Sequence, residues 1–235
     1  MSTIKVDTIA TRTGSGNITL SNNVASLTSS GAISGTNLTA SGTLGVTGAA
    51  TFSGGIANTG TITAGTVGSN VVFPSGHIIQ TVQVATDHQQ SINTTSYTTL
   101  ANYSPVITPK YSNSKILVNV CLHFGEGSDA FPAFKVYRTP SGGSATQIAQ
   151  GANLQQRASF AYVGTENSGR DQYRITLLNW QYLDSPSTTD ALTYHVDVSP
   201  MRTTPRLVVF NRHNEMSDAN RASTISTFTL QEIAQ

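Results

Sequence analysis

The first 76 residues of this 235-residue chain place one large apolar residue at steps of mostly five or six, with little else that could fill a core. Gly, Ser, Thr and Ala supply 47 of these 76 residues, and the only charges are Lys5, Asp7 and Arg12. Such a density of glycine and threonine argues against helix. Because one copy has too few apolar residues for a core, we predict short β segments that bury their apolar stripe against further copies of the chain.

An intertwined shaft of three chains over residues 17–76 satisfies this pattern, since Gly allows the turns while Ser and Thr face water. A flexible Gly/Ser linker is the alternative, although a linker needs no regular apolar spacing. The charges of this part all fall in residues 1–16, which we interpret as an anchoring segment. The residues expected at the trimer core of the shaft are Ile18, Ile33, Leu38, Leu44, Phe52, Ile62, Val67 and Phe73. The residues expected in the anchor are Ile4, Lys5, Val6, Asp7, Ile9 and Arg12.

Residues 77–235 have a different composition, with all eight Tyr, the single Trp and 22 of the 25 charges, eleven of each sign. Apolar residues alternate with others from Ile116 to Leu122 and from Leu192 to Val198, which is typical of half-buried strands. We therefore predict an all-β chain, in which a jelly-roll-like β-sandwich knob follows the shaft and its first and last strands pair near the junction. The predicted strands are 77–84, 98–103, 115–124, 133–137, 147–149, 160–163, 173–181, 191–198, 207–210 and 223–233.

Charge and cysteine content exclude several classes of protein. A net charge of +1 gives no electrostatic reason to bind nucleic acid, and no apolar run approaches the ~20 residues that span a bilayer. The opening residues lack the apolar core of a signal peptide. The lone Cys121 excludes a disulfide framework and a cysteine-built zinc site. No histidine spacing matches a metal motif, so we predict no metal and no cofactor; His213 and Glu215 are expected in a surface loop, with an ion site on a trimer axis as the alternative.

Two regions resemble a known family. The opening MSTIKVDTIATRTGSGNITL, with the repeats that follow it, resembles the N-terminus of fibre proteins of tailed phages, especially marine and cyanobacterial ones. The segments ITPKYSNSKILVNV (107–120), YLDSPSTTDALTYHV (182–196) and the final STISTFTLQEIAQ resemble the C-terminal knobs of the same proteins. The resemblance implies a homotrimer whose N-terminus is held by a tail adaptor or nozzle, or by the capsid, with the knob outward. The strand ASTISTFTLQ is also similar to the closing strand of trimeric jelly rolls of the tumour-necrosis-factor and complement-C1q type.

These observations together predict a structural protein of the virion surface, assembled in the host cytoplasm, with attachment of a tail fibre to the host cell as the favoured role. A head fibre or capsid decoration protein is the alternative, and a polysaccharide depolymerase is a third hypothesis. Contact with a host surface glycan is expected at the end of the knob away from the shaft, in two loops, 125–132 and 164–174, because they combine Gly, acidic, amide and aromatic residues. The candidate receptor-binding residues are Glu126, Asp129, Phe131, Glu166, Arg170 and Tyr173.

Glycoside hydrolysis would need two carboxylates about 5 Å or about 6.5–9.5 Å apart. Glu126 with Asp129, and Asp184 with Asp190, are the candidate pairs in loops, but acidic residues there more often cap turns, so we predict no catalytic residue. Eight arginines outnumber three lysines in the knob. We expect these arginines to pair with carboxylates of neighbouring subunits, such as that of Asp184, with contact to acidic glycans as the alternative.

Overall fold

The chain divides into two units, Met1–Gly65 and Thr66–Gln235. The computed structural model describes Thr47, 71–127, 130–151, 161–162, 173–199, 201–214 and 222–235. The anchor 1–16 and the expected trimer-core residues other than Phe73 therefore lie outside the described residues. Phe73 is half-buried, and its ring stacks on that of His77 of the same chain, with 5.0 Å between the ring centroids.

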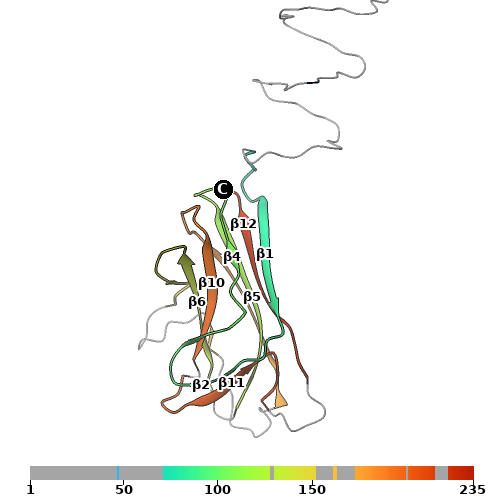
Figure 1. Cartoon of the computed structure of the whole chain (residues 1–235), viewed down its shortest axis with the longest axis vertical. Helices are drawn as coiled ribbons and strands as arrows, with labels where there is room; N and C mark the ends of the chain where they lie inside the picture. Colours follow the sequence, from blue (N-terminus) through green and yellow to red (C-terminus); the bar gives the residue numbers. More distant parts are fainter. Residues whose placement is uncertain are drawn as a thin grey trace, which may run out of the picture. The chain divides into compact units, whose positions relative to one another are not determined.

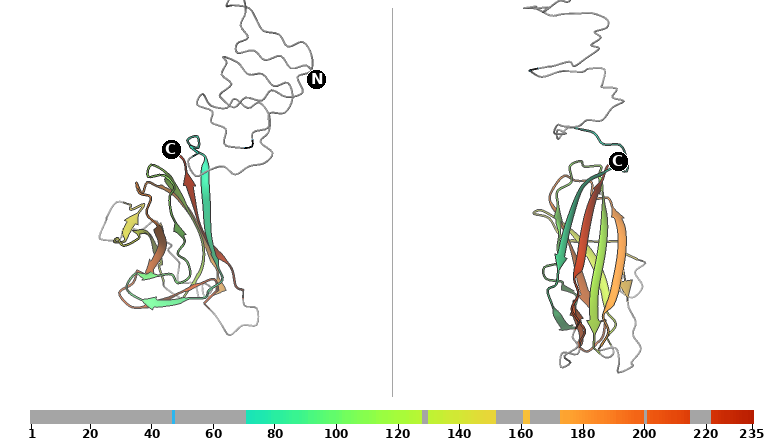
Figure 2. Two further views of the ribbon diagram at one scale, coloured as in Figure 1. Left: turned by 45° about the horizontal axis from the view of Figure 1, so that its top comes forward. Right: turned by 90° about the vertical axis from the view of Figure 1, so that its right-hand side faces the viewer.

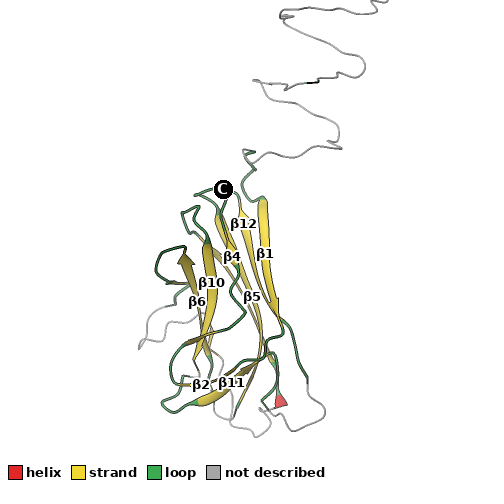
Figure 3. Ribbon diagram, in the orientation of Figure 1, coloured by secondary structure: helices red, strands yellow, loops and turns green. Residues whose placement is uncertain are grey.

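The described part of the second unit consists mostly of strands joined by loops and turns (Figure 3). An all-β fold is thus confirmed for this part of the chain. Its strands are β1 (Ile78–Thr86), β2 (Ser91–Thr94), β3 (Thr98–Thr99), β4 (Val106–Ile107), β5 (Lys115–Glu126), β6 (Ala133–Pro140), β7 (Thr146–Ile148), β8 (Ala161–Tyr162), β9 (Thr176–Asp184), β10 (Leu192–Ser199), β11 (Arg206–Phe210) and β12 (Ser226–Ile233).

The strands form two sheets that pack as a sandwich (Figure 1). In the first sheet β5 is the central strand. One edge of β5 pairs with β12 and, further along, with β11, and the other edge pairs with β9. β1 pairs with the outer edge of β12, and β2 pairs with the outer edge of β11. In the second sheet β6 and β10 pair along their length, with β7 and β8 on β6 and with β3 and β4 on β10. The described strands of these two sheets pair antiparallel, as expected of a jelly roll or sandwich.

The core lies between the sheets and is built by the alternation seen in the sequence. Side chains of β5 from Ile116 to Phe124 and of β10 from Leu192 to Val198 are buried at every second position. The rings of Phe124 and Phe134 meet across the sheets with their centroids 5.2 Å apart. Burial of every second residue fixes the register, because a slip by one residue would expose the whole apolar set.

Both the entry and the exit of the sandwich lie at one end, which we call the terminal end. β1 and β12 pair antiparallel from Ile78–Ile233 onward, so the expected pairing of the first and last strands is confirmed. The amide of Gly76 donates to the carbonyl of Ala234 (2.8 Å), and the amide of Ala234 donates to the carbonyl of His77 (2.9 Å). The opposite end, where β1 and β5 finish, is called the distal end (Figure 1).

A buried carboxylate also fastens the terminal end. Glu232 is fully buried and accepts hydrogen bonds from the amide of Lys110 (2.7 Å) and the side-chain amide of Gln80 (2.6 Å). Gln80 donates in addition to the carbonyl of Thr108 (2.7 Å). One acidic side chain on β12 thereby holds both β1 and the loop that precedes β5.

The two sheets are joined by a second buried carboxylate. Asp184, the last residue of β9, accepts from the guanidinium of Arg138 on β6 (2.9 and 2.7 Å) and from the hydroxyl of Tyr194 on β10 (2.8 Å). Burial, together with the adjacent Asp184 carboxylate, raises the pKa of Tyr194 far above its ordinary value. The expectation that Asp184 pairs with an arginine of a neighbouring subunit is wrong for Arg138, because that side chain reaches Asp184 within its own chain.

Candidate functional site

The distal end is where the loops expected to bind a receptor begin and finish. β5 ends there at Glu126, and β6 starts at Ala133 after a short connection. β9 starts at Thr176, which pairs with Phe124, so the chain just before β9 also lies at this end. The described residues of these loops therefore lie at the end away from residue 71 and from the C-terminus, as expected.

A tight backbone approach shapes the distal end at Gly125. A Cβ atom at this position would lie 2.7 Å from the carbonyl oxygen of Arg212, and 3.0 Å from the carbonyl oxygen of Arg174 and from the Cα of His213. Only glycine allows three chain segments to meet this closely. The meeting brings the end of β5, the residues before β9 and those after β11 into contact.

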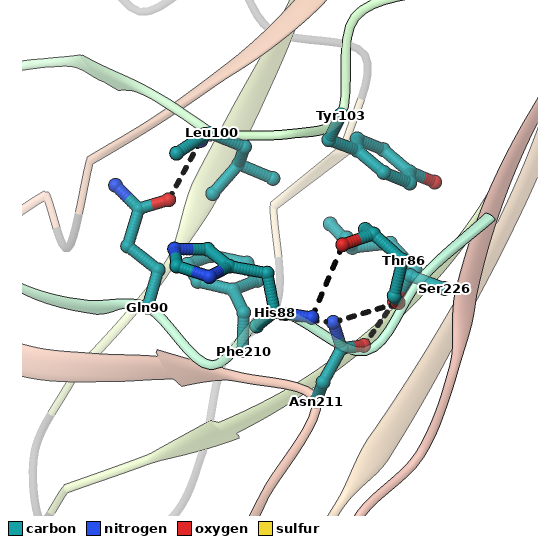
Figure 4. Close-up of a pocket in the computed structure, with 10 residues that line it drawn as sticks. Thr86, His88, Gln90, Leu100, Tyr103, Phe210, Asn211 and Ser226 are labelled. Atoms are coloured by element: carbon teal, nitrogen blue, oxygen red, sulfur yellow. Dashed lines mark hydrogen bonds between the residues drawn. The ribbon is translucent and has the colours of Figure 1, made fainter. Parts of the chain in front are cut away.

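Asn211 forms the hydrogen-bond centre of this end (Figure 4). Its side-chain amide donates to the carbonyls of Thr86 (3.1 Å) and His88 (2.9 Å), and its side-chain oxygen accepts from the hydroxyl of Ser226 (2.6 Å). The hydroxyl of Ser226 in turn accepts from the amide of His123 (2.9 Å). With a φ of 57°, Asn211 occupies the left-handed region, which asparagine tolerates better than most residues.

These bonds join the ends of β1 and β11 to the start of β12 and leave a small hollow between them. The hollow has a cavity volume of only about 10 Å³ and is lined by Leu100, Tyr103, Phe210 and neighbouring residues (Figure 4). Tyr103 is buried, and its hydroxyl donates to the carbonyl of Thr227 (2.7 Å), with the carbonyl of Cys121 3.1 Å away. Burial, with the nearby Cys121, raises the pKa of Tyr103 far above its ordinary value. The hollow is smaller than the ~300 Å³ of typical ligand pockets, so we interpret it as part of a rigid base for the loops.

The structure brings three of the six candidate receptor-binding residues to the distal end. Tyr173 is 53% exposed, and Phe131 is half-buried with the guanidinium carbon of Arg202 3.8 Å from its ring centroid. Glu126 is 2% exposed, so its carboxylate lies beneath the surface and not on it. Asp129, Glu166 and Arg170 lie outside the described residues, and the binding role of all six stays a prediction.

His213 differs from expectation. It is buried, at 6% exposure, where a surface loop was expected, because it packs against the close approach at Gly125. Its partner in the alternative ion site, Glu215, lies outside the described residues. Within the described ranges no group of three or more His, Cys, Asp or Glu side chains is placed to hold a metal ion. The same ranges contain no helix with the length and hydropathy needed to cross a membrane.

Sequence reasoning missed the residues that organise this end. Asn211 follows the apolar run of β11 directly, and an Asn at such a position is a weak signal for a left-handed turn. The contact of Arg202 with Phe131 joins residues 71 positions apart, and no local pattern indicates it. The described distal end thus presents one arginine–phenylalanine pair and one exposed tyrosine on a hydrogen-bonded base. Aromatic rings and guanidinium groups of this kind can stack on and hydrogen-bond to a polar ligand.

No protein-family model matches the chain, and no curated protein sequence matches it. Among solved structures, that of infectious bursal disease virus strain Gx matches at 13% identity over 68% of this chain and 38% of that chain, with a TM-score of 0.36. The VP2 subviral particle of the same virus matches at 13% identity over 68% of this chain and 42% of that chain, with a TM-score of 0.31. The CBM22-1 xylan-binding domain of Paenibacillus barcinonensis Xyn10C matches at 12% identity over 70% of this chain and 99% of that chain, with a TM-score of 0.27. The chain spans about two fifths of the viral chains that it matches, and likenesses at this level carry no argument about function.

Proposed function

We propose that the chain is a structural protein of a tailed-phage virion: a homotrimeric tail fibre whose knob attaches to the host cell through its distal end. The observation that carries the proposal is the arrangement of the sandwich. Residues 71–77 and the C-terminus meet at the terminal end through the bonds between Gly76, His77 and Ala234, so the opposite end is left to loops. This is the arrangement that a knob needs when its N-terminal side faces the particle.

Two further features support this role. The first 76 residues carry an apolar stripe that one copy cannot bury, which favours a shaft of several chains. The N-terminal segment and three knob segments resemble tailed-phage fibre proteins, as described above. The proposed ligand is a glycan of the host surface, bound weakly at each knob and strengthened by repetition of the site on the particle.

The test of location is immunogold labelling of intact virions with an antibody raised against the purified chain. Gold at the tail is the expected result. Gold spread over the head would contradict the tail-fibre proposal and favour the capsid-decoration alternative, and absence of label from purified particles would refute a virion role altogether.

The test of attachment uses the full-length protein, clustered on beads, with cells of the bacterium that the virus infects. Tyr173→Ala should reduce bead binding at least about tenfold, because it removes an exposed ring at the distal end. Val106→Ala is the matched control, since Val106 is 50% exposed on β4 at the terminal end, against 53% for Tyr173. Equal binding of wild type and Tyr173→Ala would show that this residue takes no part, and failure of wild-type beads to bind would refute attachment by the knob.

A further inference from the structure

The middle of the outer side of the first sheet carries no charged side chain, and Lys115 lies in the next row toward the terminal end. On β1, β12, β5 and β9, every second side chain points away from the core, and the pairing aligns twelve of these side chains in three complete rows across the four strands. Hydrogen bonds within the rows, from Gln83 to Thr229 (2.8 Å) and from Gln231 to Thr81 (3.3 Å), agree with this alignment. The three rows, which we call the neutral face, are Ala85–Thr227–Cys121–Asn179, Gln83–Thr229–Asn119–Gln181 and Thr81–Gln231–Leu117–Leu183.

None of these twelve residues is charged, and Figure 2 (right) shows the four strands side by side. A sheet face that water covers normally carries charged side chains, because apolar and amide groups gain little there. The second sheet of the same sandwich follows that rule. Its outer side carries the facing pair Lys135 and Asp197, with the Lys135 ammonium 4.0 Å from the ring centroid of Tyr97 and the Asp197 carboxylate accepting from Thr99 (2.7 Å). The two outer faces therefore differ in kind.

Exposed large apolar side chains gather on the first sheet as well. Among the described residues, nine such side chains are exposed, and eight lie on β1 or β9 or in the segments that lead into β1, β9 and β12. Val72 is the most exposed, at 84%. Of the eight, Leu183 belongs to the neutral face, and Leu177 and Ile78 lie in the rows next to it, opposite His123 and Ile233, whereas Tyr182 is opposite the buried Val118 and points to the other side of the sheet. Exposed apolar side chains in and next to an uncharged sheet face are typical of an interaction surface.

We infer that the neutral face is the surface through which the knob packs against the knobs of other copies of this chain. The inference rests on the proposed homotrimer and adds where the knobs meet. Because none of its side chains carries a charge, the neutral face can pack toward a three-fold axis against neighbouring copies without stranding an ion. An acidic or basic partner would find no opposite charge among the twelve residues.

The position of the neutral face agrees with this occupant. Four strands about 4.8 Å apart and five residues, or about 17 Å, long cover roughly 330 Å², so this face would form the centre of an interface in which one partner buries ~800 Å². The face also continues into residues 71–78, where Val71, Val72 and Ile78 are exposed just after the stretch whose apolar stripe requires further copies.

The experiment uses the full-length chain and its single cysteine. Cys121 is half-exposed on the neutral face and forms no disulfide, so its reaction with a bulky maleimide reports whether this face is covered. Asn119→Asp places a charge in the middle row, two residues along the same strand, and Asn119→Lys places the opposite charge there. Thr193→Asp is the control, because Thr193 is a half-buried residue that alternates with the buried side chains of β10 in the second sheet. Light scattering gives the mass of each protein, and Trp180 fluorescence confirms folding.

We expect a wild-type trimer in which Cys121 reacts at least about tenfold more slowly than in both Asn119 variants, with Thr193→Asp behaving as wild type. Use of both charge signs separates an opened interface from a direct effect of charge on the thiol, which would act in opposite directions. If the wild type is a trimer but Cys121 reacts equally fast in all four proteins, the inference is overturned while the homotrimer stands. The same holds if Cys121 reacts as slowly in both Asn119 variants as in the wild type. A wild-type monomer would instead refute the homotrimer of the proposed function and this inference with it.

Discussion

Asp184 provides a measurable link between the two sheets of the sandwich. Its carboxylate accepts two bonds from Arg138 and one from Tyr194, and the side chains of Asp184 and Arg138 are only 7% and 18% exposed. Asp184→Ala leaves the guanidinium and the hydroxyl without this acceptor. Breaking a buried pair costs about 3–5 kcal/mol, and the partial exposure of Arg138 places the expected loss near the lower value, about 3 kcal/mol.

Urea unfolding followed by the fluorescence of Trp180 measures this loss, because Trp180 is the single tryptophan and lies on the same strand as Asp184. With a slope of about 2 kcal/mol per molar urea, the midpoint should fall by about 1.5 M at a fixed protein concentration. Asp197→Ala is the comparison variant: its carboxylate is 17% exposed, lies 3.7 Å from His195 and accepts one bond from the Thr99 hydroxyl (2.7 Å), so its loss should cost only about 1.5 kcal/mol.

A double variant, Arg138→Met with Asp184→Ala, distinguishes a stranded charge from lost packing. It should be more stable than Asp184→Ala alone, because no buried guanidinium is left without its carboxylate. Equal midpoints for Asp184→Ala and Asp197→Ala would refute the reasoning that the Asp184 carboxylate joins the sheets.

Three further results are expected. Gly125→Ala should lower the free energy of unfolding by about 1–3 kcal/mol in urea, since its Cβ would lie 2.7 Å from a main-chain oxygen. At Gly127 the nearest atom is 3.4 Å away, so Gly127→Ala should be nearly neutral, and similar losses at both sites would contradict the close approach. The free energy of unfolding should fall as pH rises above about 10, by up to about 1.4 kcal/mol per pH unit for each of Tyr103 and Tyr194, because burial raises both pKa values and the phenols of the unfolded chain lose their protons first. Replacement of either tyrosine by Phe should make this fall less steep in alkaline unfolding curves, and an unchanged slope would argue against the raised pKa values. Deletion of residues 2–13 should leave a trimer that no longer enters virions, as immunoblots of purified particles would show, while normal incorporation would place the anchor elsewhere.

The strands could be predicted from the sequence wherever burial alternates. The stretches 115–124, 191–198 and 223–233 lie within one to three residues of β5, β10 and β12, because each carries a strict period of two in a half-buried sheet. The strands β2 and β4 were missed: the Ser, Asn and Thr of the four-residue β2 give no apolar pattern, and the Val and Ile of β4 form a strand of only two residues. Of the strand predicted over 98–103, only Thr98–Thr99 (β3) is a strand, since the side chains of Leu100 and Tyr103 are buried in the core.

The candidate site was predictable in place but not in detail. Strand order puts the loops after β5 and before β9 at one end, which is why Phe131 and Tyr173 could be assigned to the distal end. The burial of Glu126 and His213 depends on the meeting of three distant segments at Gly125, and such tertiary contacts leave no local trace in the sequence. The same reason explains why Asp184, expected at a loop surface, joins the two sheets.

The pairing of β1 with β12 determines how the sandwich resists mechanical load. A force applied between residue 71 and the distal loops runs along the axis of β1, and therefore at right angles to the hydrogen bonds that hold β1 to β12. In this shear geometry all the bonds of the strand bear the load together, whereas pulling from its side would open them one after another. Since forced unfolding is governed by the unfolding rate, the sandwich should unfold more slowly under a lengthwise pull than under a sideways pull of equal strength.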